Sequence, residues 1–323
     1  MKVVFITTYS SKYPNRLEML AGFKALGAEV FDLQAKYISL SREYLAGVLD
    51  SFQPDWILTV RGQGLNSEIY QAAEERGVAT VLWIEHIEDE IEDWVVDLAK
   101  ANRYFFTSVK GMVERYQQAG LDNCGYIPQG FQPEAYGLTE RETVDYEEEE
   151  YILFTGKVHR RYNERARVLE RLINKGYEVK WHGERVPWTW KNLGFKMRYP
   201  GLNRSHQCKP VYFSELAEAI GRSRVVLGLQ MYSDIELCIS SRLWQVLGCG
   251  GFFLCQYIKG IEKIFELDKE LVCYNDEEDL LEKLDYYWRQ SDKRREIAAA
   301  GQKKIWGLHK YSDRFREMAK IVL

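Results

Sequence analysis

A short stretch near residue 240 combines two hydroxyls and an arginine at the predicted start of a helix. Ser240, Ser241 and Arg242 open an amphipathic run that ends at glycines and continues into the apolar strand predicted at 251–255. The first N–H groups of a helix lack intrahelical partners, and the helix dipole is positive there. Either serine can cap the helix, and the arginine offers a fork of donors. The stretch therefore predicts a phosphate-binding helix start, although an ordinary helix of a parallel sheet would show the same pattern.

A second group of cations follows an apolar run in the middle of the chain. Lys157, Arg160 and Arg161 come just after the predicted strand 151–155 and Gly156. Open α/β sheets bind ligands beyond the carboxyl ends of their strands, and a glycine lets the backbone approach a ligand closely. We expect these cations to face the helix start at Ser240. The alternative for the arginine pair is a solvated basic turn.

The first half of the chain offers a candidate base. Glu85 and His86 follow the predicted strand 80–84, and either could deprotonate a hydroxyl once its pKa is tuned near neutrality. A structural role is the alternative for a single histidine at a strand end. The segments 9–15 and 61–64 follow two other predicted strands, so we expect them at the same edge of the sheet.

Apolar runs of strand length alternate with helix-period segments along the whole chain. In the first half, strands are predicted at 3–7, 29–33, 56–60, 80–84 and 104–107, and helices at 15–26, 41–52, 66–76, 89–100 and 109–119. In the second half, strands are predicted at 151–155, 178–182, 225–229 and 251–255, and helices at 163–174, 214–221, 240–247, 277–289, 291–306 and 311–321. Such alternation predicts parallel, doubly wound sheets.

Two segments break this alternation. Residues 138–150 are acidic and lack apolar periodicity, so they predict a domain linker. Residues 184–212 are rich in Trp, Pro and Arg without a clear period and predict a long insertion. We therefore expect an N-terminal domain over 1–140, a C-terminal domain over 151–305 and a terminal helix over 306–323.

Composition limits the function classes. The chain has 323 residues and a net charge of −4, which argues against wholesale coating of nucleic acid. Its six cysteines form no Cys-x2-Cys pair and its five histidines are dispersed, so the sequence predicts buried thiols in a reducing compartment and no zinc site. No apolar run reaches the length of a membrane span, and the first residues do not resemble a signal peptide. These features predict a cytoplasmic protein.

Several motifs together resemble a known family. The segments 240–254, 297–301 and 309–314, with 151–157 and the following arginines, are similar to motifs of glycosyltransferases of the two-Rossmann-domain (GT-B) architecture, in particular the spore maturation CgeB-like family. The resemblance is clear in the second half and holds only in outline in the first. One departure concerns Gln245, which stands where related retaining transferases carry the second acid of a Glu-x7-Glu pair, and Leu237 stands at the first position. Retaining chemistry therefore does not carry over.

The resemblance implies a fold and an activity. It implies two Rossmann-like domains facing across a cleft, a last helix that crosses back to the first domain, and transfer of a sugar from a UDP- or GDP-linked donor to a hydroxyl acceptor. The cations would hold the pyrophosphate with no metal and no further cofactor, because no Asp-x-Asp is present. Gln245 could bond a ribose hydroxyl, with an exposed helix residue as the alternative. Glu236, in the loop before the helix, could touch the donor sugar, with a simple turn carboxylate as the alternative. The acceptor stays open between protein, glycan, small molecule and modified nucleobase.

Two rival functions remain at this stage. Sugar-nucleotide epimerases share the same architecture. A CgeB-like protein that binds a sugar or coat surface without catalysis is the other rival, since the acid at position 245 is missing. Binding without turnover would favour the second, and an altered sugar would favour the first.

Overall fold

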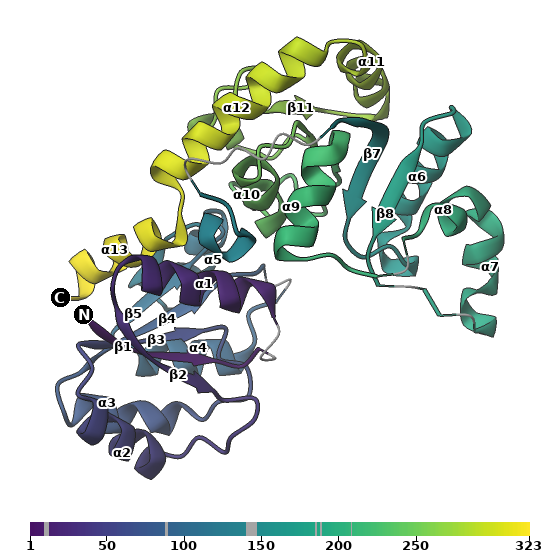
Figure 1. The fold of residues 1–323 in the computed structure, drawn as a ribbon. Helices are drawn as coiled ribbons and strands as arrows, with labels where there is room; N and C mark the ends of the chain where they lie inside the picture. Colours follow the sequence, from purple (N-terminus) through teal and green to yellow (C-terminus); the bar gives the residue numbers. More distant parts are fainter. Residues whose placement is uncertain (10–12, 88–89, 140–146, 185, 188, 208) are drawn as a thin grey trace.

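The computed structural model consists of two α/β domains, each built on a parallel sheet (Figure 1). It describes residues 1–9, 13–87, 90–139, 147–184, 186–187, 189–207 and 209–323. The two doubly wound domains predicted from the sequence are therefore confirmed. Both sheets carry helices on their faces, which explains why their central strands are mostly apolar and largely buried.

The first domain has a six-stranded sheet in the order β2-β1-β3-β4-β5-β6. Its elements are β1 (Lys2–Thr7), α1 (Pro14–Ala25), β2 (Glu29–Gln34), α2 (Arg42–Phe52), β3 (Trp56–Val60), the 3-10 helix Ser67–Tyr70, α3 (Gln71–Glu74), β4 (Ala79–Ile84), α4 (Asp93–Ala101), β5 (Tyr104–Thr107), α5 (Met112–Gln118) and β6 (Cys124–Tyr126). The strand order reverses between β1 and β3. In open α/β sheets, ligands bind at the carboxyl edge beside such a switch point.

The second domain has a five-stranded sheet in the order β11-β10-β9-β7-β8. After the 3-10 helix Pro133–Tyr136, its elements are β7 (Glu149–Thr155), the 3-10 helix Arg160–Tyr162, α6 (Asn163–Asn174), β8 (Val179–His182), α7 (Trp190–Arg198), α8 (Pro200–Ser205), α9 (Phe213–Arg222), β9 (Ser223–Gly228), α10 (Ser241–Gly248), β10 (Phe253–Gln256), the 3-10 helix Ile261–Lys263, β11 (Val272–Tyr274), α11 (Glu277–Trp288), α12 (Ser291–Leu308) and α13 (Tyr311–Val322). Here the switch point lies between β7 and β9.

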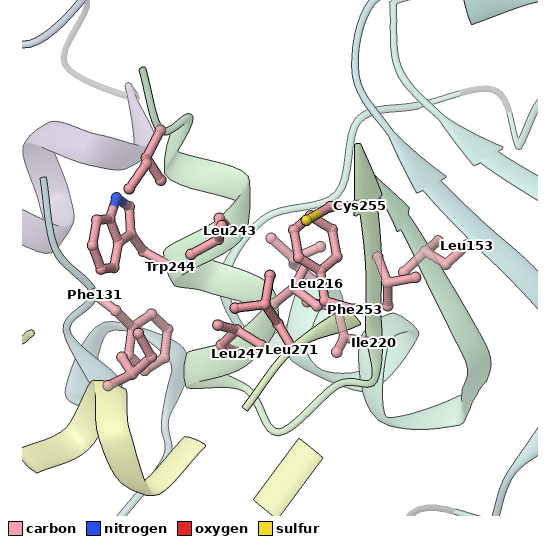
Figure 2. Packing of buried hydrophobic residues seen from close by; sticks show 14 of the residues in the cluster. Phe131, Leu153, Leu216, Ile220, Leu243, Trp244, Leu247, Phe253, Cys255 and Leu271 are labelled. Atoms are coloured by element: carbon pink, nitrogen blue, oxygen red, sulfur yellow. The ribbon is translucent and has the colours of Figure 1, made fainter. Parts of the chain in front are cut away.

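Helix α10 joins the second core to the domain junction. Its apolar side chains include Leu243, Trp244 and Leu247, which lie between the strand residue Phe253 and the junction residue Phe131 (Figure 2). All five side chains are completely buried. Burial of this stripe fixes the axis of α10, and therefore fixes where its N-terminus points.

The terminal helix α13 lies against the first domain, beside α1 and the N-terminus (Figure 1). Phe315 stacks on Phe23 with ring centroids 3.8 Å apart. At the start of the crossing, Arg314 Nη2 lies 2.6 Å from His309 Nδ1. Burial and the Arg314 charge lower the pKa of His309 to about 3, so the imidazole is neutral and accepts this hydrogen bond.

The segment predicted as an irregular insertion is partly helical, which corrects the sequence prediction. It contains α7 and α8, and the second of these is held by a tertiary contact. The buried Glu170 carboxylate on α6 accepts hydrogen bonds from the N–H groups of Gly201 and Leu202, at 2.9 and 2.7 Å. A capping group supplied by another helix leaves no local sequence signal.

The linker prediction is also corrected at its end, because β7 already begins at Glu149. Residues 140–146, the centre of the predicted linker, lie outside the described residues. The strands β6 and β11 have three residues each and were not predicted. Runs this short give too little periodicity to separate a strand from a turn. The domain limits themselves stay a prediction.

Candidate functional site

The carboxyl end of β7 and the N-terminus of α10 meet at the switch point of the second sheet. Gly156 follows β7 with a φ of +141°, a conformation that side chains rarely adopt. A Cβ there would collide with the guanidinium of Arg242. Arg242 Nε donates to Thr155 Oγ1 at 3.1 Å, which fixes the arginine over the strand end. Gly156 thus makes room for Arg242, a role the sequence alone does not show.

A second arginine lies beside Arg242. Arg165, near the start of α6, donates to the Lys157 carbonyl at 3.2 Å and lies 4.4 Å from the centre of the Tyr162 ring. Burial, together with the charge of Arg165, lowers the pKa of Arg242. Neither guanidinium forms an ion pair with a carboxylate in the described part of the chain. Two cations held together without an anion create a strong preference for an anionic ligand.

The helix start adds neutral donors to this site. Ser240 occupies the N-cap position of α10, yet its hydroxyl makes no capping hydrogen bond. The hydroxyl oxygen is buried and has no hydrogen-bond partner, as is also true of Gln230 Nε2 in the loop after β9. The predicted serine cap is therefore wrong in this structure. Ser241 is the first residue of the helix. Unused donors at a helix start suit a phosphate.

The other predicted cations lie at the rim. Lys157 Nζ is 3.3 Å from Glu184 Oε1, and both side chains are exposed. Arg160 and Arg161 are exposed residues of one turn of 3-10 helix. The structure thus brings Arg242 and Arg165 together and leaves these three nearer to solvent.

Glu236, predicted to touch the donor sugar, takes part in a contact between the domains. Its carboxylate pairs with Lys263 Nζ at 2.5 Å, and this hydrogen bond lowers its pKa. Its backbone carbonyl accepts from the Gly111 N–H of the first domain at 2.9 Å. A side chain at Gly111 would press on this loop, because its Cβ would lie 2.8 Å from Ile235 Cγ2.

Gln245, predicted to bond a ribose hydroxyl, contacts the first domain in this structure, and the ribose contact stays a prediction. Its amide donates to Glu18 Oε1 of α1 at 3.0 Å, across the domain junction. Tyr136 donates to the same oxygen at 2.6 Å. Glu18 is buried, and its other carboxylate oxygen has no hydrogen-bond partner. Gln245 lies about one helical turn after Arg242, on roughly the same face of α10. At this point along the helix, that face lies against the first domain.

Replacing Glu18 by glutamine is expected to stabilise the protein at high pH. Burial raises the pKa of Glu18 from 4.5 to about 7. The stabilising contribution of the neutral acid is complete below about pH 4.5 and is lost as the pH rises through about 7. Glu18→Gln should therefore gain up to about 3 kcal/mol in free energy of unfolding at about pH 8, with little gain near pH 4.5.

Urea unfolding of both proteins across this pH range measures the effect. The matched control is Glu74→Gln, at an exposed glutamate of α3, which should show no pH-dependent difference from the wild type. A constant difference between Glu18→Gln and wild type at all pH values would contradict a buried titrating acid.

The carboxyl edge of the first sheet gathers a second polar cluster. Glu85, at the end of β4, is 4% exposed and accepts a hydrogen bond from the Tyr9 hydroxyl. Tyr9 stacks on Tyr13 with ring centroids 4.0 Å apart, and the Arg61 guanidinium lies 5.2 Å from the Tyr9 ring centre. The loops after β1, β3 and β4 therefore meet here. Residues 10–12 of the first loop and Glu88 and Asp89 after Glu85 lie outside the described residues.

Electrostatics favour Glu85 as a proton acceptor at this edge. Burial raises its pKa, and the hydrogen bond from Tyr9 and the nearby His86 oppose the rise. The buried polar atoms here that lack a hydrogen-bond partner are Thr7 Oγ1, Thr8 Oγ1, Glu85 Oε2, Ser108 Oγ and Gln129 Oε1. Buried polar groups without partners are rare outside sites that await a ligand or water. The cluster can therefore receive a polar substrate.

Metal ligands and cavities lie elsewhere or are absent among the described residues. Within the described residues, no group of three or more His, Cys, Asp or Glu side chains could hold a metal ion. No helix found there is long and apolar enough to cross a membrane. A cavity of about 540 Å³ lies at the opposite, amino edge of the second sheet, between α9 and α12. Its lining includes Thr139 and Glu148, which lie on either side of the residues that the structure does not describe in the linker. It includes neither the Arg165 and Arg242 pair nor Glu85.

Comparison with known proteins identifies the second half of the chain. Residues 160–320 match the family model described as "Glycosyl transferase-like". This segment is therefore similar to the glycosyl transferase-like family. A search among curated sequences finds no match to the chain. The glycosyltransferase activity predicted from the sequence is thereby supported, and the chain is a glycosyltransferase of the GT-B fold.

Solved structures share this fold at low sequence identity. A glycosyltransferase from Rickettsia africae is 12% identical, with a TM-score of 0.67 over 99% of this chain and 97% of that one. The Anabaena protein HepE, solved with UDP, is 11% identical, with a TM-score of 0.63 over 99% of both chains. A Listeria monocytogenes protein, provisionally assigned as a UDP-N-acetylglucosamine 2-epimerase, is 13% identical, with a TM-score of 0.56 over 99% of this chain and 95% of that one.

Three residues of this glycosyltransferase's site were missed from the sequence. Arg165 lies inside a predicted amphipathic helix, where an arginine normally faces solvent. Glu18 lies in the first turns of α1, and Gln230 in a loop with no motif. The only available signal was an unusually arginine-rich start of the helix at 160–167, and it does not separate Arg165 from its neighbours.

Proposed function

We propose that the glycosyltransferase binds a nucleoside-diphosphate sugar at the second domain and transfers the sugar to an acceptor hydroxyl held by the first domain. The observation that carries this proposal is the pair Arg165 and Arg242, which have no carboxylate partner among the described residues. They lie near a helix start with an unused Ser240 hydroxyl. A diphosphate leaving group develops negative charge as the sugar departs. Fixed cations and helix-start amides stabilise that charge.

The nucleotide to test first is UDP. HepE, which shares the fold, was solved with UDP and with UDP-glucose. In this chain, Arg242 lies at the carboxyl end of β7 and offers a cationic partner for such a diphosphate. GDP-linked donors are the second choice. Lys157 lies at the rim with Arg160 and Arg161. It can turn toward the diphosphate because its ion pair with Glu184 is exposed and therefore weak.

We propose Glu85 as the general base of an inverting displacement. Its carboxylate would take the proton of the acceptor hydroxyl while that oxygen attacks the anomeric carbon and the nucleoside diphosphate leaves. A raised pKa makes the carboxylate a better proton acceptor near neutrality. Gln245 supports this direction, since it contacts Glu18 and supplies no acid of its own. His86, next in the chain, is the alternative base.

Nucleotide binding is expected to need no metal. Calorimetry with UDP, GDP and their sugars, in EDTA and then with added manganese, measures this. The expected result is equal affinity under both conditions, because arginines replace the metal as counterions. Binding that EDTA abolishes and manganese restores would contradict it.

The same samples separate the rival functions. Released nucleotide with a glycosylated acceptor supports transfer. A donor whose sugar has changed configuration supports the epimerase. Nucleotide binding with no turnover over a broad acceptor panel supports a non-catalytic binding protein. Membership of the CgeB-like subfamily and a cytoplasmic location are part of the same proposal, and they rest on the motifs and on the cysteine pattern.

A further inference from the structure

The solvent-facing side of α7 has an unusual composition. Its exposed residues are Trp190, Lys191, Gly194, Met197 and Arg198. Their spacing of one, four, seven and eight positions from the first places all five along one face of a helix. This face, which we call the α7 face, therefore presents two large apolar side chains and two cations, with no acidic residue.

The apolar members of the α7 face project far into solvent. Trp190 is 92% exposed and Met197 is 73% exposed, the two highest values for large hydrophobic side chains in the described residues. Single exposed hydrophobic residues are normal. Two of them spaced two helical turns apart, on one face and flanked by cations, form a pattern typical of helices that lie at a membrane interface.

Charge is concentrated around this helix. Residues 185–214 include six Lys and Arg and no Asp or Glu, in a chain whose net charge is −4. Arg198 lies 5.8 Å from the Tyr199 ring centre. Neither it nor Lys191 forms an ion pair with any described residue. The two cations are therefore available to an anionic surface.

The opposite side of α7 is anchored, so the α7 face is held in place. Phe195 is buried against Tyr199, with ring centroids 5.0 Å apart. The Tyr199 hydroxyl donates to Asn163 of α6 at 2.8 Å, and Glu170 caps the start of α8. Figure 1 shows α7 at the outer edge of the second domain, far from α12 and α13. No other element covers it in that view.

We propose that the α7 face docks on an anionic lipid surface. The indole and the thioether would enter the boundary between headgroups and acyl chains, and the ammonium and guanidinium groups would contact lipid phosphates. The proposal goes beyond the transfer reaction. It also implies that the reaction takes place near the membrane. The segment carrying α7 begins after β8, and β8 ends at the same sheet edge as Gly156. Docking would therefore hold the proposed donor site close to the lipid.

Two other partners fit the α7 face less well. A second copy of the chain would bring the cations of one α7 face against those of the other, because a two-fold interface pairs identical patches. A nucleic acid would use stacking and many phosphate contacts. The α7 face has one aromatic ring, a thioether that cannot stack in this way, and two cations.

Vesicle co-sedimentation tests the proposal with the full chain. We expect strong binding to phosphatidylcholine vesicles that contain phosphatidylglycerol, and weak binding to phosphatidylcholine alone. We expect two double variants, Trp190→Ser/Met197→Ser and Lys191→Glu/Arg198→Glu, to bind less well. Each should reduce the vesicle-binding constant about tenfold or more. In Trp190→Phe, binding should persist while quenching of tryptophan fluorescence by brominated lipid falls.

The matched control is Tyr286→Ser/Lys293→Glu, which removes another exposed aromatic and cation in mutual contact, at 3.2 Å, on α11 and α12. This variant should bind vesicles like the wild type. Circular dichroism and the melting temperature show whether each variant is folded. Equal binding to neutral and anionic vesicles, wild-type binding by both α7 variants, or an equal loss in the control would overturn the proposal. Preferential binding of a single-stranded oligonucleotide, or self-association lost in the α7 variants, would overturn it in favour of those partners.

Discussion

Glu85→Gln is expected to lower kcat by about 10²- to 10⁴-fold, the range for loss of a general base. Glutamine keeps the shape of the side chain, and its carbonyl can still accept the Tyr9 hydrogen bond. It cannot take a proton. Nucleotide affinity, measured by calorimetry, should stay at the wild-type value, because the proposed donor contacts lie in the second domain. Steady-state kinetics of nucleotide release in the presence of acceptor measure the loss.

The pH dependence provides an independent readout of the same group. The base must be ionised, and burial raises the pKa of Glu85 above its ordinary value of 4.5. Wild-type kcat/KM should therefore fall as the pH drops through that raised pKa. The residual activity of Glu85→Gln should lack this acid limb. Near-normal turnover of Glu85→Gln, with a large loss in His86→Asn, would transfer the role of base to His86.

Removing the arginine pair is expected to have the second largest effect. Arg242→Ala and Arg165→Ala should each weaken nucleoside diphosphate binding by about 1.5–3 kcal/mol, the range for hydrogen bonds to charged groups. The two effects need not add, because the guanidinium groups share one anion. The unliganded variants should lose little stability by comparison, since each substitution relieves the repulsion between neighbouring cations. Calorimetry with UDP and urea unfolding separate the two quantities.

Arg167→Ala is the matched control for this prediction. Arg167 lies on the same helix as Arg165 but pairs with the carboxylates of Glu164 and Glu277. Its loss should leave nucleotide affinity unchanged. If both Arg165→Ala and Arg242→Ala bind UDP like the wild type, the phosphate site must lie elsewhere.

The sequence predicted most of the fold because the relevant signals are local. Central strands such as 56–60 are buried throughout and mostly apolar, since helices cover both faces of the sheet, and such runs stand out between amphipathic segments. The helix 163–174 was predicted with its observed limits. Elements that depend on distant partners were not predicted. The α8 start is one example, because Glu170 on another helix supplies its cap.

The sequence by itself determined the composition of the proposed donor site: a glycine after a strand, and a serine and an arginine at a helix start. These residues are close in sequence to the element ends that position them, so spacing was enough to find Gly156, Ser240 and Arg242. Only the tertiary structure decided which partners they meet. Arg165 joins Arg242, and Gln245 turns to Glu18 of the other domain. The physical reason is that these contacts depend on how helices pack across the sheet and across the domain junction, and such packing is fixed by burial of the whole core rather than by the residues in contact.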